Sequence, residues 1–199
     1  GQRADTPVIA SLSRAGSMDI LRTAEALKPA KSKRIHIVIA TSDLHMKHKL
    51  RMSPDEVVQA SVESVTLARQ HADDVEWSAE DATRSDPDFL CRVVEAAIKA
   101  GATTINLPDT VGIGTPKTIY EMFASVRAAV DIPLSVHNHN DFGLAAMYAT
   151  ARLLRLVFVV NLAIRWLGRA LLGVPGFVVV LQLVEHLPPA ALVSLLERA

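Results

Sequence analysis

Short apolar runs alternate with longer amphipathic stretches along the first 150 residues of the chain. The run Arg34–Ala40 is almost continuously apolar, which is typical of a strand whose two faces are both covered. Further strands are expected at residues 8–12, 75–78, 103–107 and 132–136. The stretches between them have the apolar spacing of amphipathic helices, so the pattern predicts a regular alternation of strand and helix.

Polar residues followed by proline mark the starts of three expected helices. Ser53-Pro-Asp-Glu combines an N-cap serine, a proline at the first helical position and acids in the first turn. Asp86-Pro and Thr115-Pro repeat this signal. Ser17 is a good N-cap for the helix after the first strand, and Gly101 can end the helix that starts at Asp86.

The order of these elements predicts the fold class. Short strands separated by helices form βαβ units and a parallel sheet. A glycine-rich turn of the form G-x-G-x-x-G does not follow any expected strand, which argues against a dinucleotide-binding Rossmann domain. We therefore expect an α/β fold, and within that class a (β/α)8 TIM barrel or a piece of one.

Polar residues gather where four of the expected strands end. Active sites of such barrels lie at the carboxyl ends of the strands and in the loops that follow. Four sequences occupy these places here: Thr41-Ser-Asp-Leu-His45, Ser78-Ala-Glu-Asp-Ala-Thr83, Pro108-Asp-Thr110 and His137-Asn-His-Asn-Asp141. The amino ends of the strands carry nothing comparable, and this asymmetry indicates catalysis.

The histidine pair in the last of these sequences indicates a metal site. His137 and His139 are two residues apart, so on a strand they project from one face, together with Asp141. Two imidazoles at a strand end can bind a divalent metal if other segments supply oxygen ligands. Ordinary surface hydrogen bonding is the alternative, and the polar ends of the neighbouring strands favour the metal.

Composition narrows the possible classes of protein. At 199 residues the chain is long enough for one substantial core. Basic and acidic residues balance at 21 each, so no nucleic-acid-binding surface made by bulk charge is expected. Cys91 is the only cysteine, which excludes an internal disulfide and favours a reducing compartment, expected to be the cytoplasm. It lies on a helical pattern and is expected to be a small core residue.

The last thirty residues are more apolar than a surface helix of a barrel. A membrane span needs about 20 uninterrupted apolar residues, and this region and its approach contain Arg165, Arg169, Pro175 and Gln182. We expect a buried or partner-facing segment and no membrane span. A membrane anchor and a rearranged gene end are the alternatives.

Together the polar strand ends resemble a known enzyme family. The motifs are Ile39-Ala-Thr-Ser-Asp-Leu-His45 with Lys49-Leu50, Ser78-Ala-Glu-Asp-Ala-Thr-Arg84, Leu107-Pro-Asp-Thr-Val-Gly112 and His137-Asn-His-Asn-Asp-Phe-Gly143. In this order, over roughly residues 6–147, they resemble 2-isopropylmalate synthase and its relatives, the homocitrate and citramalate synthases.

The resemblance implies a TIM-barrel acyltransferase that condenses acetyl-CoA with 2-oxoisovalerate to give 2-isopropylmalate, a step of leucine biosynthesis. A divalent metal (Mg, Mn or Zn) would hold the 2-oxo acid and polarise its keto group as a Lewis acid. The partners implied are therefore acetyl-CoA and a 2-oxo acid, and the full-length enzyme is expected to be a homodimer.

The resemblance also assigns roles to single residues. It places Glu80 and Thr110 near the oxo-acid substrate. From their places at the strand ends we expect catalytic roles for Glu80 and His45, and substrate binding by Ser78, Thr110 and Thr41. The metal ligands would be His137, His139 and Asn161. Purely structural alternatives stay open. Glu80 could cap a turn, Thr110 could hydrogen-bond a backbone group, and His45 could be a solvated side chain in a basic loop.

The chain departs from the family at both ends. The family's first strand carries Leu-Arg-Asp-Gly, with a metal-binding aspartate and a catalytic arginine, and no such motif occurs here. We therefore expect an incomplete barrel without its first strands. After Met147 the sequence diverges, and only Val160-Asn161 resembles the family's last strand. The expected domains are a partial TIM-barrel catalytic domain at 1–161 and a divergent apolar helical tail at 162–199.

Two other functions stay open. A sibling condensing enzyme, or a metal-dependent lyase or aldolase, would use the same histidine strand with a different substrate pocket. An inactive remnant or an interaction module is a different class, since an open barrel exposes strand edges and apolar surface.

Overall fold

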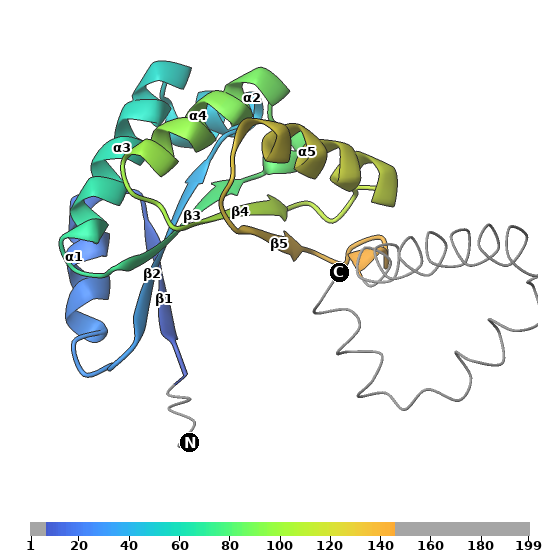
Figure 1. Cartoon of the computed structure of the whole chain (residues 1–199). Coiled ribbons are helices and arrows are strands. Elements are labelled where there is room, and N and C mark those ends of the chain that lie inside the picture. Colours follow the sequence, from blue (N-terminus) through green and yellow to red (C-terminus); the bar gives the residue numbers. More distant parts are fainter. Residues whose placement is uncertain (1–6, 146–199) are drawn as a thin grey trace, which may run out of the picture. The chain divides into compact units, whose positions relative to one another are not determined.

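The computed structural model describes residues 7–145, which form a parallel sheet with helices between its strands (Figure 1). Its five strands lie in chain order in the sheet: β1 (Ile9–Arg14), β2 (Lys33–Ala40), β3 (Asp74–Glu80), β4 (Thr104–Asp109) and β5 (Leu134–Asn138). Four longer helices connect them: α1 (Ser17–Ala26), α3 (Pro54–Arg69), α4 (Pro87–Lys99) and α5 (Pro116–Ala129). Short helical turns follow β2 and β3: α2 (Asp43–His45), the π-helical η1 (Met46–Leu50) and the 3-10 turn η2 (Ala82–Arg84).

The core lies between the sheet and its helices, which share one side of the sheet in Figure 1. Alternate residues of β2 and β3 point into it: Ile35 and Ile37 of β2 are fully buried beside Val75 and Trp77 of β3. Burying such an aliphatic side chain contributes about 1.5–3 kcal/mol. The alternation therefore fixes which face of each strand meets the helices, and the next residues along the strands occupy the other face.

The other face carries a chain of polar side chains across three strands. Ser78, Asn106 and Ser135 are in register on β3, β4 and β5. The Ser78 hydroxyl donates to the Asn106 amide oxygen at 2.8 Å, and the Asn106 amide nitrogen donates to Ser135 Oγ at 3.0 Å. A slip of one residue would break both bonds, so this chain helps to set the register that aligns the strand ends.

The helix starts predicted from proline are confirmed. Ser53 forms a capping box with Glu56, and Thr115 forms one with Thr118. The Asp86 side chain accepts the backbone N–H of Phe89. In each case the polar side chain satisfies a backbone donor that the first turn of a helix leaves free.

Three local predictions need correction. Gly16, not Ser17, is the N-cap of α1, because Gly16 has the extended backbone and Ser17 already lies in the helix. The last strand runs two residues later than expected, through His137 to Asn138, because backbone pairing with β4 continues past the apolar run. The expected basic loop after Thr41 is instead the helical turns α2 and η1.

The chain divides into two units, Gly1–Tyr148 and Ala149–Ala199, and the described residues all belong to the first. Asn161, the predicted boundary at residue 161 and the predicted helical tail lie outside the described residues. Within residues 7–145, no helix is long and apolar enough to cross a membrane.

Candidate functional site

The ends of β2 to β5 are joined by hydrogen bonds at one edge of the sheet. The Thr41 N–H donates to the Glu80 carbonyl at 3.0 Å, and the Asp81 N–H donates to Thr110 Oγ1 at 2.8 Å. The His139 N–H donates to the Asp109 carbonyl at 3.1 Å. The four polar sequences that follow the strands therefore meet at one edge, which we call the polar rim.

Strand register places Glu80 and His137 on the same face of the sheet. His137 pairs with Pro108, and the pairing of Ser78 with Asn106, continued by two residues, brings Glu80 level with Pro108. Parallel strands lie about 4.8 Å apart, so the two residues are separated by about 10 Å along the rim. A small substrate can span such a distance.

Asp81 is a buried carboxylate that ties two strand ends together. Its side chain is fully buried, and it accepts the Ser42 hydroxyl at 2.5 Å and Arg84 Nε at 2.8 and 3.0 Å. The hydrogen bond and charge of Asp81 raise the pKa of Arg84 above its ordinary value. Asp81 adopts a left-handed backbone, with φ of 66°. This turn lets Glu80 and Asp81 point to different partners although they are neighbours in the chain.

The ion pair of Glu80 with Lys49 and the neighbouring His45 form one cluster of the rim. Lys49 Nζ donates to both Glu80 carboxylate oxygens, at 2.5 and 2.8 Å. His45 Nδ1 lies 3.7 Å from Glu80 Oε1 and 3.6 Å from Asp81 Oδ2. This nitrogen is buried and makes no hydrogen bond to any described residue. The imidazole is therefore held between two carboxylates, where it can hold or pass on a proton.

The two predicted metal-binding histidines lie side by side and are exposed. The rings of His137 and His139 are stacked, with centroids 5.2 Å apart and an interplanar angle of 21°. They supply two nitrogen donors, which fit half of a tetrahedral site. Among residues 7–145, no group of three or more His, Cys, Asp or Glu side chains could hold a metal ion. The described residues therefore fit a divalent metal as a partial site, which needs ligands from other segments.

The loop after β5 packs against the loop after β4. Gly112 has φ of +66°, and a Cβ there would come within 2.5 Å of Asp141 Oδ2. The Phe142 N–H donates to the Gly112 carbonyl at 3.3 Å. Because β5 ends at Asn138, Asp141 follows a turn, and strand alternation does not place it beside the imidazoles as expected.

The three predicted substrate-binding hydroxyls make internal hydrogen bonds. Ser78 is nearly fully buried and donates to Asn106, while Thr41 is fully buried with its hydroxyl 2.7 Å from Ser85 Oγ. Thr110 accepts the Asp81 N–H, which is the backbone role considered as its alternative. Their contact with a substrate stays a prediction, and in this structure they support the rim.

Two residues of the rim, Lys49 and Asp81, lie in the motifs quoted above but were not among the predicted site residues. Lys49 lies four residues after His45, a spacing that brings two side chains to one side of a helix, so a helical reading of that segment could have found it. Asp81 carried no signal that separated it from Glu80, because the left-handed turn between them is not readable from the residue types.

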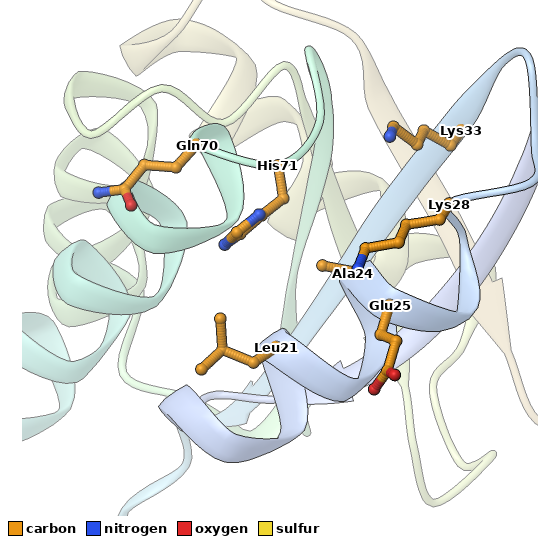
Figure 2. Close-up of a pocket in the computed structure, with 7 residues that line it drawn as sticks. All are labelled: Leu21, Ala24, Glu25, Lys28, Lys33, Gln70 and His71. Carbon is orange, nitrogen blue, oxygen red and sulfur yellow. The ribbon is translucent and has the colours of Figure 1, made fainter.

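A groove of about 410 Å³ lies near the opposite end of β2 (Figure 2). Lys33, its residue from β2, begins that strand, whereas the rim lies beyond Ala40 at its other end. The rest of the lining comes from α1 and the segments after α1 and α3: Leu21, Ala24, Glu25, Lys28, Gln70 and His71. The groove is therefore not part of the rim.

The profile of the HMGL-like family matches residues 1–153 of the chain. The chain belongs to the HMGL-like family. Among curated relatives, the 2-isopropylmalate synthase of Bradyrhizobium sp. strain BTAi1 is 54% identical over 154 residues, and that of Rhodopseudomonas palustris strain HaA2 is 55% identical. Each match covers 75% of this chain and 29% of the relative. The resemblance to 2-isopropylmalate synthases is thus confirmed, and the chain spans less than a third of those relatives' length.

Solved structures agree on the HMGL-like fold. The HMG-CoA lyase of Brucella melitensis matches with a TM-score of 0.60 and 21% identity, over 77% of this chain and 55% of that one. The hydroxymethylglutaryl-CoA lyase of Pseudomonas aeruginosa matches with a TM-score of 0.58 and 22% identity, over 75% and 51%. The predicted fold class is confirmed: the described residues provide five parallel strands of an HMGL-like TIM barrel.

Proposed function

We propose that this chain carries part of the active site of a 2-isopropylmalate synthase, which condenses acetyl-CoA with 2-oxoisovalerate. The names of its curated relatives support the reaction. The observation that carries the proposal is the polar rim, where Glu80, His45 and the histidine pair lie at the carboxyl ends of neighbouring strands. Because the chain spans 29% of those relatives, the proposal concerns the whole protein.

His137 and His139 would hold a divalent metal (Mg, Mn or Zn), with Asn161 proposed as a further ligand. Bound there, the metal supplies Lewis-acid polarisation of the keto group. The two exposed rings lie side by side at the end of β5, which supports the proposal that both belong to one site. The 2-oxo acid would lie over the rim between the imidazoles and Glu80.

Glu80 and His45 would handle the proton of the acetyl methyl group. A carbon acid needs a base within hydrogen-bonding reach and a site that orients it. The Glu80 carboxylate is held in place by Lys49, and the unpaired His45 Nδ1 lies beside it. Arg84 compensates the charge of Asp81, which also accepts the Ser42 hydroxyl, and this leaves Glu80 as the rim carboxylate that would act on a substrate.

Release of free CoA by the whole protein tests this proposal. We expect release from acetyl-CoA only when 2-oxoisovalerate and a divalent metal are both present. His137→Ala and His139→Ala should each lower turnover by about 100-fold or more, since even indirect support of a metal ligand is worth about 10–100-fold. His71→Ala, at the other end of the sheet, is the matched control and should leave turnover unchanged. CoA release that persists in both histidine variants would overturn the proposal.

The choice of oxo acid is tested in the same assay. Pyruvate and 2-oxoglutarate are the substrates of the sibling reaction types, and the size of the pocket would separate them. We expect turnover with 2-oxoisovalerate to exceed that with either by at least about 10-fold, the lower end of what a few methylene groups provide. Faster turnover of another oxo acid would make the protein a sibling condensing enzyme. A cytoplasmic location and a homodimer remain predictions.

A further inference from the structure

We propose that Lys49 is a positioning residue that fixes the Glu80 carboxylate toward His45; its effect on turnover rests on the function proposed above. Lys49 Nζ lies within hydrogen-bonding distance of both Glu80 oxygens, at 2.5 and 2.8 Å. An ammonium group that donates to both oxygens acts as a point charge that holds the end of the carboxylate in one place. His45 Nδ1 then lies 3.7 Å from Glu80 Oε1.

The π-helical turn η1 aims Lys49 at the rim. Its first residue, Met46, is buried in the core, and its carbonyl accepts the Met52 N–H at 3.1 Å. The turn ends at Arg51, which has a left-handed backbone with φ of 56°. Such wide turns are rare and occur frequently at functional sites. The Met52–Met46 hydrogen bond and the left-handed Arg51 thus close a turn that holds Lys49 at the end of β3.

The ion pair of Lys49 with Glu80 is expected to contribute little to the stability of the fold. The Lys49 side chain is 51% exposed and that of Glu80 is 22% exposed. Pairs that reach into solvent contribute about 0–1 kcal/mol, because screening and lost side-chain entropy offset the attraction. Placement of the carboxylate at the rim is therefore the stronger physical consequence of the contact.

Glu80 depends on Lys49 because the other nearby hydrogen-bond donors bind the carboxylate of Asp81. Ser42 and Arg84 both donate to Asp81. Within residues 7–145, the Glu80 carboxylate receives hydrogen bonds from Lys49 alone. Without Lys49 the Glu80 side chain would be free to rotate away from His45 into solvent.

A double-mutant cycle on the whole protein tests the proposal. Lys49→Met should lower kcat for CoA release by about 10–100-fold, the size of effect expected when a catalytic group is misplaced, and should change KM for the oxo acid by less than about 3-fold. In a Glu80→Gln background the same substitution should change kcat by less than about 2-fold. Lys49→Arg, which keeps the charge, should recover part of the loss. Equal losses in both backgrounds, or no loss in either, would overturn the proposal.

A second measurement does not depend on turnover and separates this proposal from the proposed reaction. In NMR spectra of the 199-residue chain, Lys49→Met should shift and sharpen the Glu80 carboxyl and His45 ring signals as the side chains become mobile. Lys47→Met, an exposed lysine of the same turn, is the matched control and should leave both unchanged. If these signals respond alike to both variants, Lys49 does not position Glu80. If they respond as expected and the whole protein releases no CoA, only the proposed reaction fails.

Discussion

Asp81 explains how two neighbouring carboxylates come to have different environments. Its left-handed backbone turns the chain after β3, so that Asp81 points inward to Ser42 and Arg84 while Glu80 stays at the rim with Lys49. A buried carboxylate is stable only when its charge is compensated and its oxygens are hydrogen-bonded. The compensated Asp81 therefore serves the fold, and the more exposed Glu80 is the carboxylate that the proposed reaction would use.

Asp81→Asn should destabilise the described unit by about 2 kcal/mol or more, since Arg84 then loses the buried carboxylate that compensates its charge. Arg84 is about one-third exposed, which keeps the loss below that of a fully buried pair. Chemical denaturation of the variant and of Asp43→Asn, an exposed control, measures the difference. Equal stability of the two variants would contradict this account of Asp81.

The residue types at the rim could be predicted from the sequence, but their contacts could not. Histidine, glutamate and threonine after expected strands were enough to predict that these side chains gather at one edge of the sheet, because parallel strands bring their carboxyl ends together. Which side chain faces a substrate depends on backbone angles at single residues, such as Asp81 and Arg51. Those angles are set by contacts between distant segments, so pattern alone misses them.

At the scale of elements, two loops position the histidine strand. The turn after β5 lies against Gly112 in the loop after β4, where the positive φ and the absence of a side chain allow a close approach. The backbone bond from Phe142 to the Gly112 carbonyl closes the contact. Packing of one loop on the other thus holds the end of β5, and with it His139.

Gly112→Ala should weaken this contact, because alanine is strained at φ of +66° and its methyl group would meet Asp141. We expect a loss of about 1–3 kcal/mol in stability. Gly143→Ala is the matched control: it also has a positive φ, but nothing lies within 4 Å of its added Cβ. A smaller loss for Gly112→Ala than for Gly143→Ala, in thermal or chemical unfolding, would show that the loop contact is unimportant.

The start of α3 gives the fold a dependence on pH. The Glu56 carboxylate accepts the Ser53 N–H and hydroxyl, which lowers the pKa of Glu56 from its ordinary value of 4.5. A carboxyl whose pKa is lower in the folded state stabilises the fold above its unfolded value, and this stability is lost as the pH falls through the folded value. Wild-type protein should therefore exceed Glu56→Gln in stability at pH 7, and the difference should shrink below about pH 4.5. A difference that does not change between pH 7 and pH 3 would contradict this origin.

The helix starts with proline could be predicted from the sequence because all of their interactions are local. The π-helical turn η1 could not be predicted in this way. A cap requires only residues within one turn, such as Ser53 and Glu56. The π-helical turn instead depends on the burial of Met46 and on the contact of Lys49 with a residue 31 positions later. Without those distant contacts, the three basic residues of the turn favour the prediction of a loop.

At the scale of the whole molecule, the described residues form a sheet with two free edges, β1 and β5. The face of the sheet opposite the helices combines the hydrogen-bonded side chains of Ser78, Asn106 and Ser135 with exposed apolar residues such as Leu12. In a closed barrel both edges are paired and the inner residues are packed in layers. The five strands thus present the rim of a barrel, and within residues 7–145 the proposed metal site has only two of its ligands, His137 and His139.

This partial site leads to a prediction for the 199-residue chain alone. Two imidazoles without a carboxylate bind a divalent ion weakly, so we expect a dissociation constant for Zn²⁺ weaker than about 10⁻⁶ M in calorimetric titration. The affinity should fall further in a variant with both His137→Ala and His139→Ala. Micromolar or tighter binding that requires both histidines would show that the chain completes the site by itself.

The central claim is that consecutive strands deliver these side chains to one rim beside a bound cation. Broadening of amide NMR signals by Mn²⁺ in the 199-residue chain tests this most directly, because the paramagnetic ion affects nearby nuclei whether or not the protein is active. We predict that signals of Glu80, Thr110 and His139 broaden first, that His71 at the opposite end of the sheet is unaffected, and that His137→Ala together with His139→Ala removes the effect. Broadening centred on His71, or unchanged in the double variant, would contradict the account.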